Sequence, residues 1–141
     1  IMIMDDYGHH PTEIKTTLEA VRTSWPDRRL IVVFQPHRYT RTKALFDEFA
    51  RSFYQSDILV VIPVYAAGEA AIEGIDHEVL CRAICAYGHK RASAVQGIGQ
   101  AVEDLHKTVR PGDIVLTLGA GNVWQVGDAL ADRLSDDWKK A

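Results

Sequence analysis

The chain has 141 residues, of which 47% are hydrophobic and 25% are charged, a composition typical of one globular domain with a single core. Sixteen basic and nineteen acidic residues give a net charge of −3 and a pI near 6.1, which argues against a general nucleic-acid binder. The longest nearly apolar run, residues 58–68, is too short to cross a bilayer, and no signal-type segment is recognisable, so we expect a cytoplasmic protein with no membrane partner.

Five short runs rich in Ile, Val and Leu alternate with longer amphipathic segments. The expected strands are residues 1–4, 30–34, 57–64, 92–95 and 113–118, and the expected helices are residues 11–25, 40–54, 76–87, 98–109 and 122–134. Pro11, Thr40 and Asp76 suit helix starts. Because the strand runs are apolar throughout, helices should cover both of their faces. We therefore predict a single domain over residues 1–141 with an α/β fold: a three-layer, doubly wound, mostly parallel, Rossmann-like sheet of about five strands.

In such sheets ligands bind at the carboxyl ends of the strands, in the loops that lead to the helices. Those loops read "DDYGHHP", "QPHRYTRT", "YAAGE" and "GAGN", and all four are rich in polar, ring-bearing or glycine residues. The turns at the opposite edge, "SWPDRR" and "RPGD", read as ordinary connections. We expect function to lie at the carboxyl edge.

The first of these loops carries an unusual density of ionisable side chains. Asp5 and Asp6 can hold ribose hydroxyls or a metal ion, and Gly8 permits a sharp turn or the close approach of a ligand. His9 and His10 can act as metal ligands, proton carriers or hydrogen-bond donors to an anion. The alternative is a helix-capping network, which is common at helix starts but which we expect to account for only one of the two aspartates.

The second loop predicts an anion site. Arg38 and Arg41 lie three residues apart after a buried strand, and Thr40 or Thr42 is placed to cap the following helix, whose backbone N–H groups favour an anion. Guanidinium groups form paired hydrogen bonds with carboxylates and phosphates. The alternative is that these arginines only solvate the surface.

Two further patterns are weaker. "GAGNVW" matches half of the dinucleotide-binding fingerprint, but its sixth position is Trp124 and it follows the last strand, so a complete NAD site is not expected. His77, Cys81 and Cys85 repeat every four residues and can line one helical face, for which two buried core thiols are favoured over a metal site. The two cysteines are badly placed to bridge one another, which fits a reducing compartment.

An acidic pair after the first strand is also found in phosphorylated receiver domains of signalling pathways. A domain of that kind needs an aspartate at the end of the third strand and a lysine after the fifth. The corresponding segments here read "PVYAAG" and "LGAGN" and contain neither residue. The sequence therefore argues against this signalling function.

Four segments, "DDYGHHPTEI", "VFQPHRYTRT", "YAAGE" and "LGAGN", resemble in order and spacing the C-terminal domain of the Mur ligase family. The resemblance covers essentially the whole chain, and the double-histidine turn with "PHRYTR" is specific to the branch that adds L-alanine. Family members have three domains. Nothing here matches "GxxGKT/S", the phosphate loop of the central ATPase domain, or the N-terminal UDP-binding domain, so the chain alone is expected to be inactive.

The resemblance implies an ATP- and magnesium-dependent ligation in peptidoglycan precursor synthesis, with both cofactors bound mainly by the central domain. The lactyl carboxylate of UDP-N-acetylmuramate is phosphorylated, and the amine of L-alanine then attacks the acyl phosphate. By similarity, Asp6 contacts the ATP ribose, Tyr7 and His9 shape the alanine pocket, and Arg38 and Arg41 hold the alanine carboxylate or the transferred phosphate. His9, Arg38 and Arg41 are thus the expected catalytic residues, and no metal ligand is expected.

A second hypothesis belongs to another functional class. A stand-alone Rossmann-like domain that binds a nucleotide or an anion for regulation would use the same carboxyl edge. Such a domain should bind its ligand measurably without partner domains, whereas a ligase domain should bind weakly because half of each site lies elsewhere.

Overall fold

The computed structural model describes residues 1–140, which form five strands and six helices. In chain order these are β1 (Met2–Asp6), α1 (Pro11–Ser24), β2 (Leu30–Phe34), α2 (Tyr39–Ala44), α3 (Phe46–Ala50), β3 (Ile58–Val61), α4 (His77–Ala86), β4 (Ala92–Ala94), α5 (Ile98–Thr108), β5 (Ile114–Leu118) and α6 (Trp124–Lys140). The predicted α/β alternation is confirmed.

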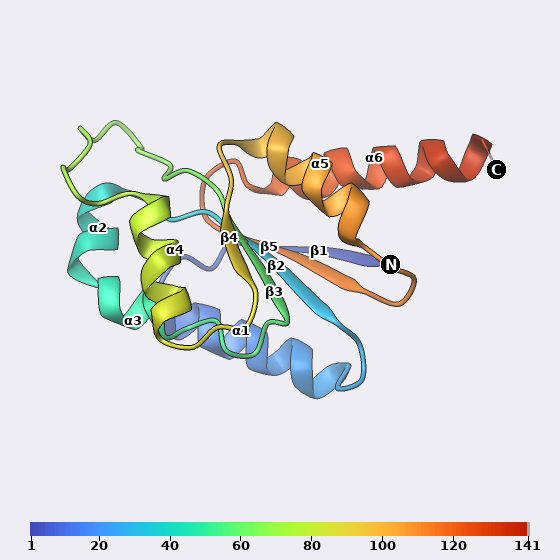
Figure 1. Ribbon diagram of the computed structural model, residues 1–141, viewed down its shortest axis with the longest axis horizontal. Coiled ribbons are helices and arrows are strands. Elements are labelled where there is room, and N and C mark those ends of the chain that lie inside the picture. Colours follow the sequence, from blue (N-terminus) through green and yellow to red (C-terminus); the bar gives the residue numbers. More distant parts are fainter. Residues whose placement is uncertain (141) are drawn as a thin grey trace.

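The strands form one sheet in the order β1-β5-β2-β3-β4, and every pairing in it is parallel (Figure 1). β5 therefore lies between β1 and β2, with Asp6 and Phe34 both in register with Leu118. This order brings the carboxyl ends of β1, β5 and β2 side by side. The chain leaves β2 toward one face of the sheet and β5 toward the other, which is where open α/β sheets bind ligands.

Helices cover both faces of the sheet, as predicted (Figure 1). α1, α3 and α4 pack on one face, and α5 and α6 pack on the other. β2 shows why its sequence is apolar throughout: Leu30, Val32 and Phe34 enter the first core cluster, whereas Ile31 and Val33 enter the second. Successive side chains of a strand point to opposite faces, so a strand covered on both sides needs an apolar residue at every position.

The predicted helix over residues 40–54 is wrong in its extent. It divides into two short helices at Leu45, whose φ of −115° and ψ of 22° leave the helical region. After the break, Phe49 and Phe53 pack against Phe34 with ring centroids 5.7 and 4.9 Å apart. The other predicted ends shift less, except that α6 continues to Lys140 instead of ending at residue 134.

The amino edge of the sheet is more than a set of turns. Asp113 is only 4% exposed and accepts hydrogen bonds from Arg29 Nε at 3.1 Å, Arg29 Nη2 at 2.7 Å and the Arg110 N–H at 2.8 Å. Asp57 accepts from Arg22 at 2.9 Å and from the Leu30 N–H at 2.7 Å. These ion pairs join the amino ends of β2, β3 and β5.

No helix within residues 1–140 has both the length and the apolar character that spanning a membrane requires.

Candidate functional site

The turn between β1 and α1 is held by its own acidic side chains. Asp6 Oδ2 accepts hydrogen bonds from the Gly8 N–H at 3.0 Å and from the Thr17 hydroxyl at 3.2 Å. A Cβ on Gly8 would lie 2.7 Å from that oxygen, so a larger residue there would displace the Asp6 carboxylate from its hydrogen bond. Asp5 lies within β1 and accepts a hydrogen bond from the hydroxyl of Thr117 on β5. Both aspartates therefore have structural partners, but only Asp6 belongs to the turn before the helix, which agrees with the expectation that capping accounts for one of the two.

His10 is the N-cap of α1. Its Nδ1 accepts a hydrogen bond from the Thr12 N–H at 3.3 Å, and Glu13 accepts one from the His10 N–H at 3.1 Å, which together form a capping box. Pro11 occupies the first helical position, as predicted. Its Nδ1 is thus used in the cap, so the other roles that the sequence suggests for His10 are left to Nε2.

His9 and Tyr7 extend from this turn toward the next loop. Tyr7 is 69% exposed, and its ring meets that of His9 edge to face at 6.1 Å. The Nδ1–H of His9 donates to the Tyr7 carbonyl at 3.2 Å. The His9 ring lies 5.8 Å from that of His37, the histidine of the loop after β2. The first two loops thus meet through two histidine rings.

His37 links His9 to a guanidinium group and to a second aromatic ring. Arg41 Nη1 donates to His37 Nδ1 at 3.0 Å and to the His37 carbonyl at 3.4 Å. On the other side, the His37 ring stacks on Tyr65, with centroids 5.5 Å apart and planes inclined by 11°. Tyr7, His9, His37 and Tyr65 therefore form a row of rings, called here the aromatic row, with Arg41 bound to it.

Burial lowers the pKa of His37 below the usual value of a histidine, and the positive charges of Arg41, His9 and Arg38 lower it further, although Glu69 opposes them. A neutral ring fits the geometry, because only an unprotonated Nδ1 accepts from Arg41; the proton is accordingly assigned to Nε2. Within residues 1–140, Arg41 makes side-chain hydrogen bonds only through Nη1. Its Nε and Nη2 stay available for a planar anion.

Arg38 has an unusual backbone. Its φ of 71° is in the left-handed region, which is strained for a residue with a side chain, and its N–H donates to the Tyr65 carbonyl at 2.8 Å. The predicted threonine caps are wrong. Arg38 itself is the N-cap residue, the Thr40 N–H and hydroxyl donate to Glu69, and the Thr42 hydroxyl donates back to the Arg38 carbonyl at 2.7 Å.

This arrangement changes the basis of the predicted anion site. α2 has six residues, and the Thr40 N–H at its start is already bound to the Glu69 carboxylate. The helix N-terminus therefore adds nothing to the site. The prediction of an anion site therefore rests on the two arginine side chains alone. Arg41 is half-buried and oriented by His37, and Arg38 is exposed.

The loop after β5 approaches the protein's own side chains. A Cβ on Gly121 would lie 2.5 Å from the Tyr65 ring and 2.7 Å from Gln35 Oε1, so glycine is required there by internal packing. Gln35 and Asn122 exchange two hydrogen bonds, Gln35 Nε2 to Asn122 Oδ1 at 2.8 Å and the Asn122 N–H to Gln35 Oε1 at 3.0 Å. The "GAGN" segment thus packs against Tyr65 of the aromatic row and is held there through Gln35.

A cavity of about 300 Å³ opens beside these residues at the carboxyl ends of β2, β3 and β5, between Gln35, Tyr65, Ile98 and Asn122. Sequence reasoning missed His37, Tyr65, Gln35 and Asn122 as site residues. Their loops were identified, but the contacts join residues 28 and 87 positions apart, which local patterns do not reveal.

The His77, Cys81 and Cys85 pattern resolves into separate environments. His77 is buried, and its Nε2 donates to the Val95 carbonyl at 2.7 Å. Cys81 is buried, but Cys85 is exposed, so the expectation of two core thiols is right for only one of them. Within residues 1–140, no group of three or more His, Cys, Asp or Glu side chains is placed to hold a metal ion.

The chain was compared with known families and proteins. Residues 1–121 match the family model described as Mur ligase, glutamate ligase domain. Among curated proteins, the chain is 58% identical over 135 residues to a UDP-N-acetylmuramate–L-alanine ligase of Desulforapulum autotrophicum, and 53% identical over 137 residues to one of Geotalea uraniireducens. The matches cover 96% and 97% of this chain but only 30% of each relative. The chain therefore spans about a third of the length of these relatives.

Solved structures agree on the fold. The crystal structure of a UDP-N-acetylmuramate–alanine ligase from Thermotoga maritima matches 96% of this chain and 27% of its own, with a TM-score of 0.72 at 24% identity. A murein peptide ligase from Psychrobacter arcticus matches 92% of this chain and 26% of its own, with a TM-score of 0.73 at 19% identity. At such identities the likeness concerns the fold alone.

Proposed function

Because this chain belongs to the Mur ligase family, we propose that it serves as the C-terminal, amino-acid-delivering domain of an ATP-dependent ligase that joins L-alanine to UDP-N-acetylmuramate. In this proposal the N-terminal UDP-binding domain and the central ATPase domain belong to the rest of a longer protein. The observation that carries it is the convergence of the His9 and Arg41 loops on one edge of the sheet. The identity of 58% to alanine ligases supports the choice of amino acid.

Arg41 is the group proposed to hold the carboxylate of L-alanine. Its Nη1 is fixed by His37, and its Nε and Nη2 are free within residues 1–140 to form paired hydrogen bonds with the two carboxylate oxygens. His9 lies next to His37, the partner of Arg41, and Tyr7 follows it in the aromatic row; these two rings would enclose the small methyl side chain. Arg38, exposed at the start of α2, would neutralise the phosphate that is transferred.

Asp6 is proposed to accept hydrogen bonds from the ribose hydroxyls of ATP. One of its oxygens, Oδ2, holds the turn, while Oδ1 makes no hydrogen bond within residues 1–140 and stays available as an acceptor. Asp6 therefore fits this role. No group of side chains placed to hold a magnesium ion exists in the described part of the chain, and we assign that ion to the central domain.

ATP would supply the phosphoryl group that turns the lactyl carboxylate of UDP-N-acetylmuramate into an acyl phosphate, which the alanine amine attacks. The residues of this chain position the amino acid and neutralise charge. Arg41 holds the carboxylate of alanine so that the amine faces the acyl carbon, and Arg38 stabilises negative charge on the departing phosphate. Closure of the domain over the rest of the enzyme would exclude water. The proposal places the protein in the cytoplasm, where ATP is available.

The decisive experiment is phosphate release from ATP by the full-length enzyme, comprising this chain and the upstream domains of its own gene, with UDP-N-acetylmuramate and magnesium present. Release should depend on L-alanine and fall strongly with other amino acids. Arg41→Ala should raise the KM for alanine by roughly tenfold to a hundredfold, since a charge-assisted hydrogen bond is worth about 1.5–3 kcal/mol. Arg41→Lys should restore little, because a point charge cannot form both bonds.

Two results would contradict the proposal. An enzyme that is folded and binds ATP but releases no phosphate with alanine would show that the substrate is wrong. Tight nucleotide binding by residues 1–141 alone would favour the regulatory-domain hypothesis, because a ligase domain carries only part of each site.

A further inference from the structure

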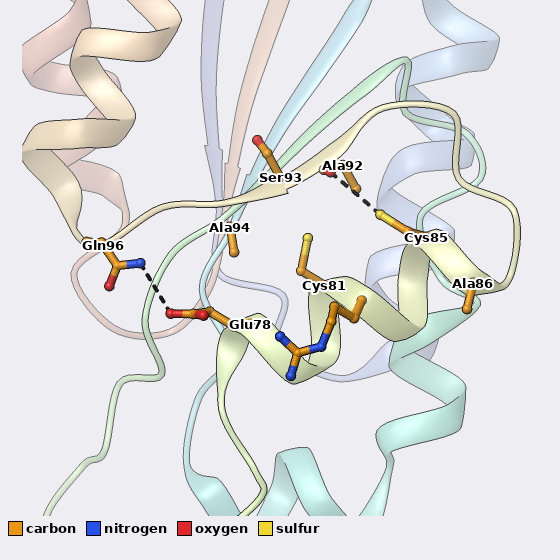
Figure 2. Close-up of a pocket in the computed structure, with 9 residues that line it drawn as sticks. Glu78, Cys81, Cys85, Ala86, Ala92, Ser93, Ala94 and Gln96 are labelled. Atoms are coloured by element: carbon orange, nitrogen blue, oxygen red, sulfur yellow. Dashed lines mark hydrogen bonds between the residues drawn. The ribbon is translucent and has the colours of Figure 1, made fainter.

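A groove of about 670 Å³ lies between α4 and the edge strand β4, and it shares no residue with the candidate site (Figure 2). Its walls come from one face of α4 and from the outer side of β4. The lining residues are Glu78, Cys81, Arg82, Cys85, Ala86, Ala92, Ser93, Ala94 and Gln96. β4 has only three residues and carries alanines on either side of Ser93, so the strand leaves this groove open.

Two thiols face this groove together. Cys81 and Cys85 are four residues apart on α4 and therefore adjacent along one side of the helix. Figure 2 shows both sulfur atoms directed toward β4, and the Cys85 thiol donates to the Ala92 carbonyl at 3.6 Å. Both cysteines line the groove. Cys81 is 5% exposed, whereas Cys85 is open to solvent, so a small ligand reaches the pair from the Cys85 side.

The number of donors limits what such a pair can bind. A structural zinc ion takes four ligands, and within residues 1–140 no third His, Cys, Asp or Glu joins the two sulfurs. Soft acceptors that are satisfied by two sulfur atoms suit the pair better. A direct disulfide needs the sulfurs at about 2.05 Å in a narrow dihedral range. One atom inserted between them allows the sulfurs to stay farther apart, as their positions on a helix require.

We propose that Cys81 and Cys85 form a dithiol site for thiophilic species that take two sulfur ligands, with trivalent organoarsenicals as the chemical class. The reaction is a condensation without oxidation or reduction. Each sulfur forms a bond to arsenic, the arsenic–oxygen bonds break, and the two thiol protons leave with the oxygen as one water molecule. Arsenic stays trivalent throughout.

The environment of Cys81 agrees with this chemistry. Burial, together with the neighbouring Cys85, raises the pKa of the Cys81 thiol to about 11, so it is protonated at neutral pH. A protonated, buried thiol reacts slowly with reagents that need a free thiolate. The condensation instead begins at the exposed Cys85 and then brings the arsenic next to Cys81, where the second bond forms within one molecule.

The test uses the reduced chain with phenylarsine oxide, followed by intact mass measurement. The expected product carries one phenylarsenic group per chain, resists an excess of the monothiol 2-mercaptoethanol and is removed by the dithiol 2,3-dimercaptopropanol. Cys85→Ser, at an exposed position, should keep the fold and lose the resistant adduct. Cys81→Ala should lose it equally and serves as the partner variant, since it introduces no polar atom into the core.

Either of two results would overturn the proposal: removal of the wild-type adduct by 2-mercaptoethanol, or a resistant adduct that persists in the Cys85→Ser chain. Circular dichroism of each variant identifies an unfolded sample. Should Cys81→Ala unfold, the comparison of wild type with Cys85→Ser alone still decides the question.

Discussion

Replacing His37 by alanine tests how the proposed alanine site is built. His37 contacts Arg41 through a 3.0 Å hydrogen bond and stacks on Tyr65, yet it needs no contact with substrate to act. Its removal frees the guanidinium group to sample several rotamers. Arg41 keeps its charge, so the change separates orientation of the arginine from its presence.

The size of the effect follows from what is lost. A hydrogen bond that involves a charged group contributes about 1.5–3 kcal/mol, but Arg41 is half-buried and recovers part of this by bonding to water. A net loss of about 1–1.5 kcal/mol corresponds to a roughly fivefold to tenfold higher KM for alanine. The KM for ATP should stay unchanged, because Asp6, the proposed contact of the ATP ribose, lies on the other loop. His37→Asn is the matched control, since its amide oxygen accepts near the position of Nδ1, and it should recover most of the alanine KM.

The pH dependence supplies an independent readout. Since the pKa of His37 is lowered, the ring stays neutral through the ordinary histidine range and becomes protonated only at lower pH. Protonation removes the acceptor and places a positive charge beside Arg41, so alanine affinity should fall on the acid side in wild type but not in His37→Asn. Steady-state kinetics of the full-length enzyme at several pH values measure both effects. An alanine KM that is unchanged in His37→Ala, or equally raised in His37→Asn, would refute the positioning role of His37.

Three other variants probe separate parts of the molecule. Asp6→Ala should raise mainly the KM for ATP, and an effect confined to alanine kinetics would show that its role is misplaced. Gly121→Ala should destabilise the fold by about 1–3 kcal/mol in denaturant melts, because the new Cβ meets the Tyr65 ring at 2.5 Å; an unchanged midpoint would mean that the ring moves freely. Asp113→Asn should cost about 2–3 kcal/mol at pH 7, since Asp113 accepts three hydrogen bonds, two of them from Arg29. Burial alone would raise the pKa of Asp113, but Arg29 and a backbone N–H outweigh it and lower the pKa below the usual value of an aspartate. This stability is therefore present above the pKa of the unfolded chain and is lost as pH falls through the pKa of the folded protein. The Asp113→Asn variant should therefore lack this part of the loss of stability at low pH. Identical acid-denaturation profiles of the variant and the wild type would exclude a contribution of Asp113 to acid denaturation.

The strands were the most predictable part of the fold. Residues 30–34 and 113–118 are apolar nearly throughout, and a strand covered on both faces needs that pattern. The helix over residues 40–54 was misjudged because its amphipathic pattern continues through Leu45, whereas in the structure the helix ends there and Phe49 then packs against Phe34 of another element. Local periodicity carries no information about such contacts.

The site was predictable as a place but not as a geometry. The carboxyl-edge rule predicted that the loops of His9 and Arg41 lie at one edge of the sheet, and they meet there through His37. The capping box of His10 and Glu13 has the right spacing, but histidine is not among the usual cap residues, so it was missed. The exposure of Cys85 was not predicted. The spacing of four residues places Cys81 and Cys85 on one face of α4, but the short strand β4 does not cover the Cys85 end of that face.

The position of β5 has a consequence for how the chain folds. β5 is the last strand in sequence, yet it separates the first two in the sheet, and Met2 pairs with Ile114. During synthesis β1 has no neighbour to pair with until nearly the whole domain has been made. Contacts between such distant residues slow folding, because the intervening chain must first be closed into a loop. β1 and the turn that follows it, with Asp6 and His9, therefore reach their final arrangement only after β5 has been inserted, so the first site residues to be synthesised are among the last to be ordered.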